Sequence, residues 1–307
     1  MQPLLTIDQS LRAYKHAHKK NPSFGMDIFA EDFFAQDVAI VEKDEMKQKG
    51  SPIKFGFFAL LLCLSGEEKR TVNQYDFQIS KNSFQLIPPG SIFSFEGITE
   101  KTEIYIIFFT EDFIKFNKED HAAESIKSLF EYHKENIDNI LLPNNMFTRI
   151  KNIYEDINIE LHEKKDEYKV VVKLLILKLL FILKREKIEK HNAYLKVETR
   201  AEQIAHQYLN LIEKHFLNFK KVSDYADLLQ ITPKHLTETV KKVLGKNALC
   251  YIHQRILQET LYLLEYTNLT ITQIASFLNF DTPSEFSRFF KIHHQMTPKQ
   301  YRLNMRI

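Results

Sequence analysis

Two short helical segments separated by a tight turn occur twice near the end of this chain, and this repeat restricts the fold more than any other feature. The first copy spans Val222–Leu244 and turns at residues 230–232. The second copy spans Ile271–His293 and turns at residues 279–281. A short helix, a tight turn and a second helix, repeated in tandem, predict two helix-turn-helix units.

The helix starts in this region carry recognisable capping chemistry. A threonine followed three residues later by Glu or Gln has the spacing of a capping box, and it occurs at Thr270/Gln273, Thr282/Glu285 and Thr297/Gln300. A proline after a threonine can occupy the first helical position, where a missing N–H costs nothing, and this occurs at Pro233, Pro283 and Pro298. With seven segments of helical pattern across residues 205–305, these starts predict a compact all-helical domain.

The second helix of each unit has one apolar face and one polar face. The apolar faces hold Leu236, Val240, Val243 and Leu244 in the first copy, and Phe286, Phe289 and Phe290 in the second. The polar faces hold Lys234, Thr237, Glu238 and Lys241 in the first copy, and Ser284, Ser287, Arg288 and Lys291 in the second. One such face alone is usually just solvated, but two tandem copies favour a pair of helices that enter the major groove of DNA.

The segment between the two copies has the length that such a pair requires. Asn247–Tyr266 is rich in Leu, Ile and Tyr, and its twenty residues predict a helix of about 30 Å. One turn of DNA is about 34 Å. A connecting helix of this size holds the two reading helices in successive major grooves on one face of the duplex.

The distribution of charge agrees with a polyanionic partner for the C-terminal part. Residues 205–307 contain 13 basic and 8 acidic side chains, whereas residues 1–204 contain 29 and 32. A basic region suits nucleic acid, although an excess of this size is also common on domains that never bind it.

The N-terminal part, from about Phe33 to Phe113, is predicted to be an antiparallel barrel or sandwich. Short apolar or alternating runs separated by turn residues are typical of strands. The predicted strands are Phe55–Leu64, Tyr75–Ile79, Ser83–Ile87, Ile92–Phe95 and Glu103–Phe109, with turns at Ser65-Gly66, Lys81-Asn82, Pro88-Pro89-Gly90 and Glu96-Gly97.

From about Asp120 the pattern becomes helical. Asn144–His162 has apolar residues at helical spacing. Tyr168–Glu186 is apolar on more than one face, so it is either a core helix or a dimerisation helix, with Leu175 and Leu179 as candidates for a dimer seam. Residues 187–200 are polar and are interpreted as a linker.

Composition excludes several other classes. Cys63 and Cys250 are far apart and have no CxxC partner, which argues against a disulfide framework or a cysteine-based zinc site and favours a reducing compartment. No histidine occurs from Asn21 to Asp120, so the metal cluster of a catalytic cupin cannot be built there. The first twenty residues do not resemble a secretory signal, and no apolar run is long enough to span a bilayer. We therefore expect a cytoplasmic protein that is not an enzyme and needs no cofactor.

Residues 222–302 resemble the DNA-binding domain of the AraC/XylS family of bacterial transcription regulators. The most specific match is the block Phe280–Lys291 followed by Thr297-Pro298. Other matching residues are Ala226, Leu229, Ile231-Thr232, His235-Leu236, Val240-Lys241, Gly245-Lys246, Tyr251-Ile252, Arg255, Glu259, Leu263-Leu264, Thr267, Ile271, Ile274-Ala275, Leu278 and Tyr301-Arg302.

Three positions depart from the family pattern. Asn279 and Gln295 each replace a usual glycine, and Thr260 replaces a frequent alanine. Asparagine tolerates positive φ, so the turn at Asn279 can survive. The N-terminal region is similar, more weakly, to the cupin-like barrel that precedes this domain in many members, with the Pro88-Pro89-Gly90 turn as the closest match.

The resemblance implies an α+β chain of three parts: a cupin-like antiparallel β-barrel regulatory domain (1–120), a helical dimerisation and linker segment (121–200), and an all-α domain with two helix-turn-helix units (201–307). The implied function is sequence-specific regulation of transcription, responsive to a ligand through the barrel. The expected partners are double-stranded operator DNA, a small-molecule effector, RNA polymerase and a second copy of the chain, with no membrane. The sequence names no ligand-binding residue, and it leaves open a regulator without ligand that a protein partner controls.

Overall fold

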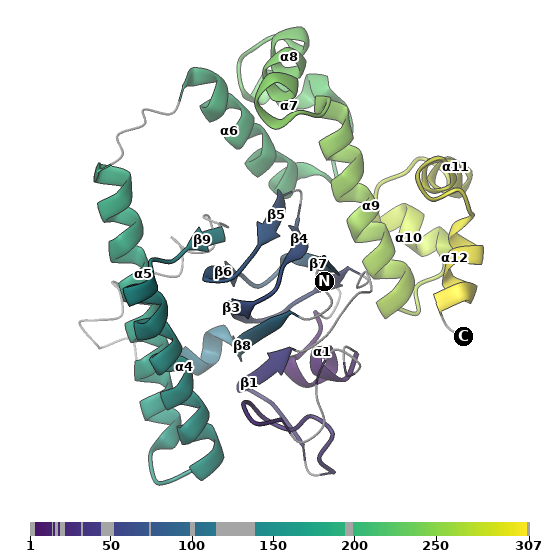
Figure 1. Cartoon of the computed structure of the whole chain (residues 1–307). Coiled ribbons are helices and arrows are strands. Elements are labelled where there is room, and N and C mark those ends of the chain that lie inside the picture. Colours follow the sequence, from purple (N-terminus) through teal and green to yellow (C-terminus); the bar gives the residue numbers. More distant parts are fainter. Residues whose placement is uncertain are drawn as a thin grey trace. The chain divides into compact units, whose positions relative to one another are not determined.

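The computed structural model describes residues 4–13, 15, 18, 22–31, 33–43, 52–73, 75–98, 102–114, 139–193 and 199–305. The chain divides into two compact units, one of Met1–Val72 with Asp76–Leu195 and one of Asn73–Tyr75 with Lys196–Ile307 (Figure 1). The helical stretch predicted to start near Asp120 lies outside the described residues up to residue 138. No helix in the described part of the chain is long and apolar enough to cross a membrane.

The first unit contains two antiparallel sheets. One has the order β1 (Val38–Lys43), β8 (Glu103–Phe109), β3 (Phe58–Ser65), β6 (Ser83–Ile87) and β9 (Asn139–Leu141). The other has the order β2 (Ile53–Lys54), β7 (Ile92–Gly97), β4 (Glu68–Val72) and β5 (Tyr75–Ile79). The predicted turns at Gly66, Asn82 and Gly90 all have positive φ, as tight turns between strands often require.

Strand β3 is apolar from Phe58 to Leu64 because both of its faces are covered. Leu60 pairs with Ile107 of β8, and both belong to the core that the five-stranded sheet shares with two helices. Leu61 pairs with Ile106, and both point to the opposite face, toward β2 and β7 of the second sheet. A continuous apolar run is therefore the pattern expected of a strand in the middle layer.

Helices α4 (Asn144–Glu163) and α5 (Tyr168–Ala193) pack against each other and against the five-stranded sheet (Figure 1). The predicted apolar stripe of α4, including Ile150 and Ile157, is buried. Helix α5 extends to Ala193, seven residues beyond the predicted end, so the first half of the segment interpreted as linker is helical. The short helices α1 (Ile7–Ala13) and α2 (Glu111–Ile114) complete the unit.

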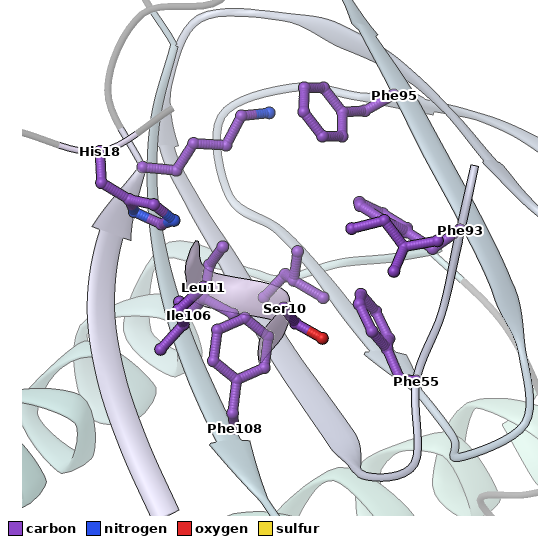
Figure 2. A pocket seen from close by; sticks show the side chains of 11 residues that line it. Ser10, Leu11, His18, Phe55, Phe93, Phe95, Ile106 and Phe108 are labelled. Atoms are coloured by element: carbon purple, nitrogen blue, oxygen red, sulfur yellow. The ribbon is translucent and has the colours of Figure 1, made fainter. Parts of the chain in front are cut away.

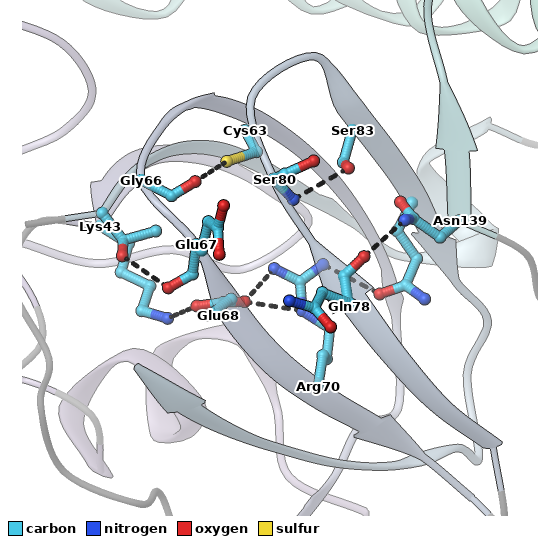
Figure 3. A network of polar contacts seen from close by, with 12 residues as sticks. Lys43, Cys63, Gly66, Glu67, Glu68, Arg70, Gln78, Ser80, Ser83 and Asn139 are labelled. Carbon is cyan, nitrogen blue, oxygen red and sulfur yellow. Dashed lines mark hydrogen bonds and ion pairs between the residues drawn. The ribbon is translucent and has the colours of Figure 1, made fainter. Parts of the chain in front are cut away.

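Strand β4 escaped the sequence prediction because its residues are charged. Glu68 and Arg70 are nonetheless fully buried, and Figure 3 shows them in a network with Lys43 of β1. Gln85 of β6 also belongs to this network. Arg70 donates from Nε to Glu68 Oε1 at 2.9 Å and from Nη1 to Gln85 Oε1 at 2.9 Å. The Lys43 ammonium donates to the other oxygen of Glu68. Burial opposes ionisation of Glu68, but the charges of Arg70 and Lys43 outweigh it and lower the pKa of this carboxyl.

The second unit consists, in its described residues, of the seven helices that the sequence predicts. They are α6 (Arg200–His215), α7 (Val222–Leu228), α8 (Pro233–Leu244), α9 (Ala248–Tyr266), α10 (Ile271–Phe277), α11 (Pro283–His294) and α12 (Pro298–Met305). The capping boxes at Thr270/Gln273 and Thr297/Gln300 are both formed. Thr282 makes the forward bond, accepting from the Glu285 amide at 3.1 Å.

Helix α9 is the axis of this unit, and arginines anchor helices to both of its ends. Near its N-terminal half, the buried Arg255 donates to Glu213 of α6 at 3.1 Å and to Glu259 at 2.9 Å. At its C-terminal end, Arg302 of α12 donates to the Leu264 carbonyl at 3.0 Å. Helices α8 and α10 also contact α9, so each helix-turn-helix unit lies against this one helix.

Candidate nucleic-acid interface

The first helix-turn-helix unit is built by local hydrogen bonds that its sequence makes available. The turn closes when the Ile231 amide donates to the Ala226 carbonyl at 3.0 Å. Thr232 then caps α8 by accepting from the His235 amide at 3.2 Å. The helix ends at Gly245, whose φ of 84° suits a residue without a side chain. The capped helix therefore has a defined start and end.

The second helix-turn-helix unit is built in the same way. The Phe280 amide donates to the Ala275 carbonyl at 3.0 Å, and Thr282 caps α11. Asn279 has a φ of 54°, so the prediction that the turn survives with asparagine in place of glycine is confirmed. Gln295 ends α11 in the left-handed region, with a φ of 58°. The turn is therefore preserved at both positions where the family glycine is missing.

The polar faces of α8 and α11, which we call the reading helices, point away from the core as predicted. Leu236 and Val240 of α8 and Phe286 and Phe290 of α11 are fully buried. The other residues of the predicted apolar faces, Val243, Leu244 and Phe289, are partly buried. The eight predicted contact residues lie on the other side. Lys234, Glu238, Lys241, Ser284, Arg288 and Lys291 are exposed, and Thr237 and Ser287 are partly exposed.

Thr237 differs from the other seven because its hydroxyl proton is used within the helix. Its Oγ1 donates to the Pro233 carbonyl at 2.8 Å. A hydroxyl in that arrangement keeps its acceptor lone pairs and loses its donor. On the outer surface it can therefore accept a hydrogen bond, whereas Lys234, Lys241, Arg288 and Lys291 can only donate.

A hollow of about 300 Å³ lies beside α11 and brings together residues that the sequence did not single out. Lys220, from the loop before α7, and His253 of α9 line it together with Arg288. The His253 ring lies 5.3 Å from the Phe289 ring and 5.2 Å from the His293 ring, centroid to centroid. Burial, reinforced by His293, lowers the pKa of His253. No local pattern in the sequence marks Lys220 and His253, because the hollow is formed by two helices, α9 and α11, together with loop residues that are distant in sequence.

The first unit contains a second candidate site, a small cavity between its two sheets. Its volume is about 50 Å³, and Figure 2 shows aromatic rings of Phe55, Phe93, Phe95 and Phe108 around it. Ser10 of α1 lies at its edge, buried, and its hydroxyl has no hydrogen-bonding partner within the described residues. The cavity therefore has a mainly apolar, aromatic lining, to which Lys43, His18 and Ser10 add polar groups. Lys43 and His18 already have hydrogen-bonding partners, and the Ser10 hydroxyl has none among the described residues.

Residues 225–304, which contain both reading helices, match the family of helix-turn-helix domains. The chain is 31% identical over 101 residues to the HTH-type transcriptional activator AarP of Providencia stuartii, a match that covers 33% of this chain and 75% of AarP. It is 30% identical over 96 residues to an uncharacterised HTH-type transcriptional regulator of Staphylococcus aureus, covering 31% of this chain and only 13% of that protein. Among solved structures, apo ToxT from Vibrio cholerae is similar with a TM-score of 0.40, at 16% identity over 88% of this chain and 98% of that chain.

Proposed function

Because this chain belongs to the AraC/XylS family of bacterial transcription regulators, we propose that it binds a specific DNA sequence and regulates transcription from it. The observation that carries the proposal is the pair of capped reading helices attached to one rigid helix, each with a buried apolar face and an exposed polar face. The 19 residues of α9 span about 28 Å, close to one turn of DNA. Its DNA partner makes the bacterial cytoplasm the place of action.

The exposed side chains divide into two kinds of contact. Arg288 carries a planar fork of donors, which matches the two acceptors on the edge of a guanine. Lys241 and Lys291 carry point charges suited to phosphates, which supply affinity without sequence information. In this proposal Arg288 contributes specificity, and the lysines contribute attraction that depends on salt.

Arg288→Ala is expected to weaken operator binding by about 1–3 kcal/mol, the size of one good base contact. The duplex for the measurement is the sequence that the parent chain selects from random DNA. Lys241→Ala is the matched comparison, because it should weaken binding to all sequences alike and flatten the salt dependence by about one unit. Equal affinity of parent and Arg288→Ala at physiological salt would remove Arg288 from the interface. Failure of the parent to enrich any sequence would overturn the proposed function.

We further propose that the cavity between the sheets receives a small apolar effector. An enclosed cavity that binds benzene measures about 150 Å³, so an effector has to widen the present space of about 50 Å³. The aromatic lining suits an apolar body, and the Ser10 hydroxyl suits one polar atom on it. The alternative left open by the sequence, control by a protein partner, predicts no ligand response from this unit. RNA polymerase remains a proposed partner at the promoter.

Ser10→Ala is expected to stabilise the free protein by about 1 kcal/mol, because it removes a buried hydroxyl that no group satisfies. The same variant should respond less than the parent to an effector found by thermal-shift screening, since the polar contact is lost. Ser91, which is also buried and does not line the cavity, provides the comparison variant Ser91→Ala. A lower melting temperature for Ser10→Ala without ligand would contradict this assignment.

The helical part of the first unit is proposed to form a homodimer, through a different face of α5 than the sequence indicated. Leu179 is fully buried inside the unit's own core and Leu175 packs against that core, so the proposed seam at these two leucines is wrong. The exposed apolar residues are Val170, Val171 and Leu174, with exposed fractions of 46%, 37% and 54%. They form one helical stripe that faces away from the sheet.

Leu174→Glu is expected to convert a dimer into a folded monomer, because a charge on the stripe would be buried without a partner in the interface. Sedimentation of the full chain at tens of micromolar measures this. Phe34→Glu changes another exposed apolar side chain of the same unit and should leave the dimer intact. A parent chain that sediments as a monomer would refute the dimer.

A further inference from the structure

The loop between α6 and α7 makes direct contact with the turn of the second helix-turn-helix unit. The ammonium of Lys220 donates a hydrogen bond to the Asn279 carbonyl and lies 3.9 Å from the centroid of the Phe280 ring. The side-chain amide of Asn279 donates to Oδ1 of Asn218 at 3.1 Å. Asn218 and Lys220, which lead into the first helix-turn-helix unit, thus hold the turn that precedes the second reading helix. We call Asn218, Lys220 and Asn279 the brace.

The chemistry of the brace depends on Asn279. Its left-handed φ of 54° is a conformation that glycine adopts more readily, and glycine is usual at this position in the family it resembles. A glycine would keep the turn but has no side chain to reach Asn218. The departure from glycine therefore costs local conformational energy and adds a hydrogen bond between the turn of the second helix-turn-helix unit and the loop that leads into the first.

Lys220 is suited to a fixed contact rather than to a mobile surface charge. It is partly exposed, and burial lowers its pKa, while the nearby carboxylates of Glu285 and Asp281 act in the opposite direction. Its ammonium has a carbonyl oxygen and an aromatic face as partners, and both attract a cation. A charge held in this way orients the turn that it touches.

The brace is a second connection between the two helix-turn-helix units, and none of its residues belongs to α9. The first connection is α9, to which Arg255 and Arg302 anchor α6 and α12. A connection through α9 alone would leave the two helix-turn-helix units free to twist about this helix by small angles. A contact between the α6–α7 loop and the α10–α11 turn, away from that axis, resists such twisting.

We propose that the brace sets the rotation between the two reading helices and thereby selects the spacing of the two DNA half-sites. The inference rests on the proposed function, since it requires that both helices contact one duplex. Inserting one base pair between half-sites rotates them by roughly 34° about the DNA axis. With the brace in place, the pair of reading helices should bind such an altered duplex much more weakly. Without it, the pair can adjust its rotation to the altered duplex more easily. The brace residues act here as positioning residues.

The test compares duplexes with the selected spacing and with one base pair inserted or removed, using the full chain. The DNA is the sequence that the parent enriches from a random pool. In Asn279→Gly the penalty for altered spacing should fall by about three- to tenfold, the equivalent of one hydrogen bond, while the melting temperature stays the same or rises because glycine suits the turn. Asn218→Ala and Lys220→Met should show the same loss of discrimination, and Lys220→Arg should retain most of it.

Lys299→Met, on the exposed side of α12, is the control for loss of one lysine charge and should leave the spacing penalty unchanged. If Lys220→Met instead lowers the salt dependence by about one unit with an unchanged spacing penalty, Lys220 contacts a phosphate and the brace is refuted. An unchanged penalty in Asn279→Gly also refutes it. If the parent enriches no sequence, the proposed function fails before the brace is tested, so the two failures are distinguishable.

Discussion

Replacing Glu68 by alanine is expected to lower the free energy of unfolding of the first unit by about 3–5 kcal/mol, because it leaves buried positive charge without compensation. Arg70 and Glu68 are both fully buried, and Lys43 is almost so. In the parent, each cation donates to the Glu68 carboxylate. Without that carboxylate, Arg70 keeps its contact with Gln85 but no anionic partner in this network.

Calorimetry of the full chain measures this effect as a fall in the unfolding transition of the first unit. Lys69→Ala removes an exposed charge from the same strand and should change stability by less than about 0.5 kcal/mol. Replacing Lys43, Glu68 and Arg70 together by apolar residues of similar size should cost far less than Glu68→Ala alone. A Glu68→Ala variant as stable as the parent would show that the ion network does not hold the second sheet in place.

Phe290→Ala is expected to destabilise the second unit by about 3–5 kcal/mol, the usual cost of truncating a buried phenylalanine. Phe290 is fully buried on the inner face of α11. Its ring stacks on His294 with centroids 4.9 Å apart and meets the Tyr301 ring edge-on at 5.5 Å. The variant therefore loses the contact between the second reading helix and α12, as well as the core beneath it. Phe286→Ala should behave similarly.

Circular dichroism of the full chain during heating follows this loss as an earlier melting of helix. Ile292→Ala is the matched control, since Ile292 lies on the same helix and is 70% exposed. It should melt like the parent. A Phe290→Ala variant that keeps the parent's melting curve but no longer binds DNA would mean that this ring acts at the interface and not in the core.

The helical unit was predictable because its signals are local. Capping bonds join residues three apart, as in Thr270 and Gln273, and the turn bonds join residues five apart, as in Phe280 and Ala275. Such contacts need only the neighbouring sequence to form. The periodicity of α8 and α11 then assigned every predicted contact residue to the outer face, because a helix with a strong apolar stripe can bury only that stripe.

The two sheets of the first unit were predicted less completely because their strand pairings are distant in sequence. The predicted strands over Tyr75–Ile79, Ser83–Ile87 and Glu103–Phe109 are confirmed with those bounds. Strands β1, β2, β4 and β9 were missed. Two of these are only two or three residues long, and β4 carries a carboxylate and a guanidinium that local rules assign to the surface. Their burial depends on Lys43, 25 residues from Glu68, and on Gln85, 15 residues from Arg70.

The sequence by itself determined that two capped helix-turn-helix units flank one connecting helix, since that pattern is set by contacts within a few residues. It also determined that α5 is apolar on more than one face, but only the tertiary structure decided that Leu179 enters the core and Leu174 remains exposed. The brace between Lys220 and Asn279, 59 residues apart, belongs to the same class. Contacts of this kind depend on how preformed elements pack, and packing selects one face of a helix or one end of a loop by shape and charge that no local pattern contains.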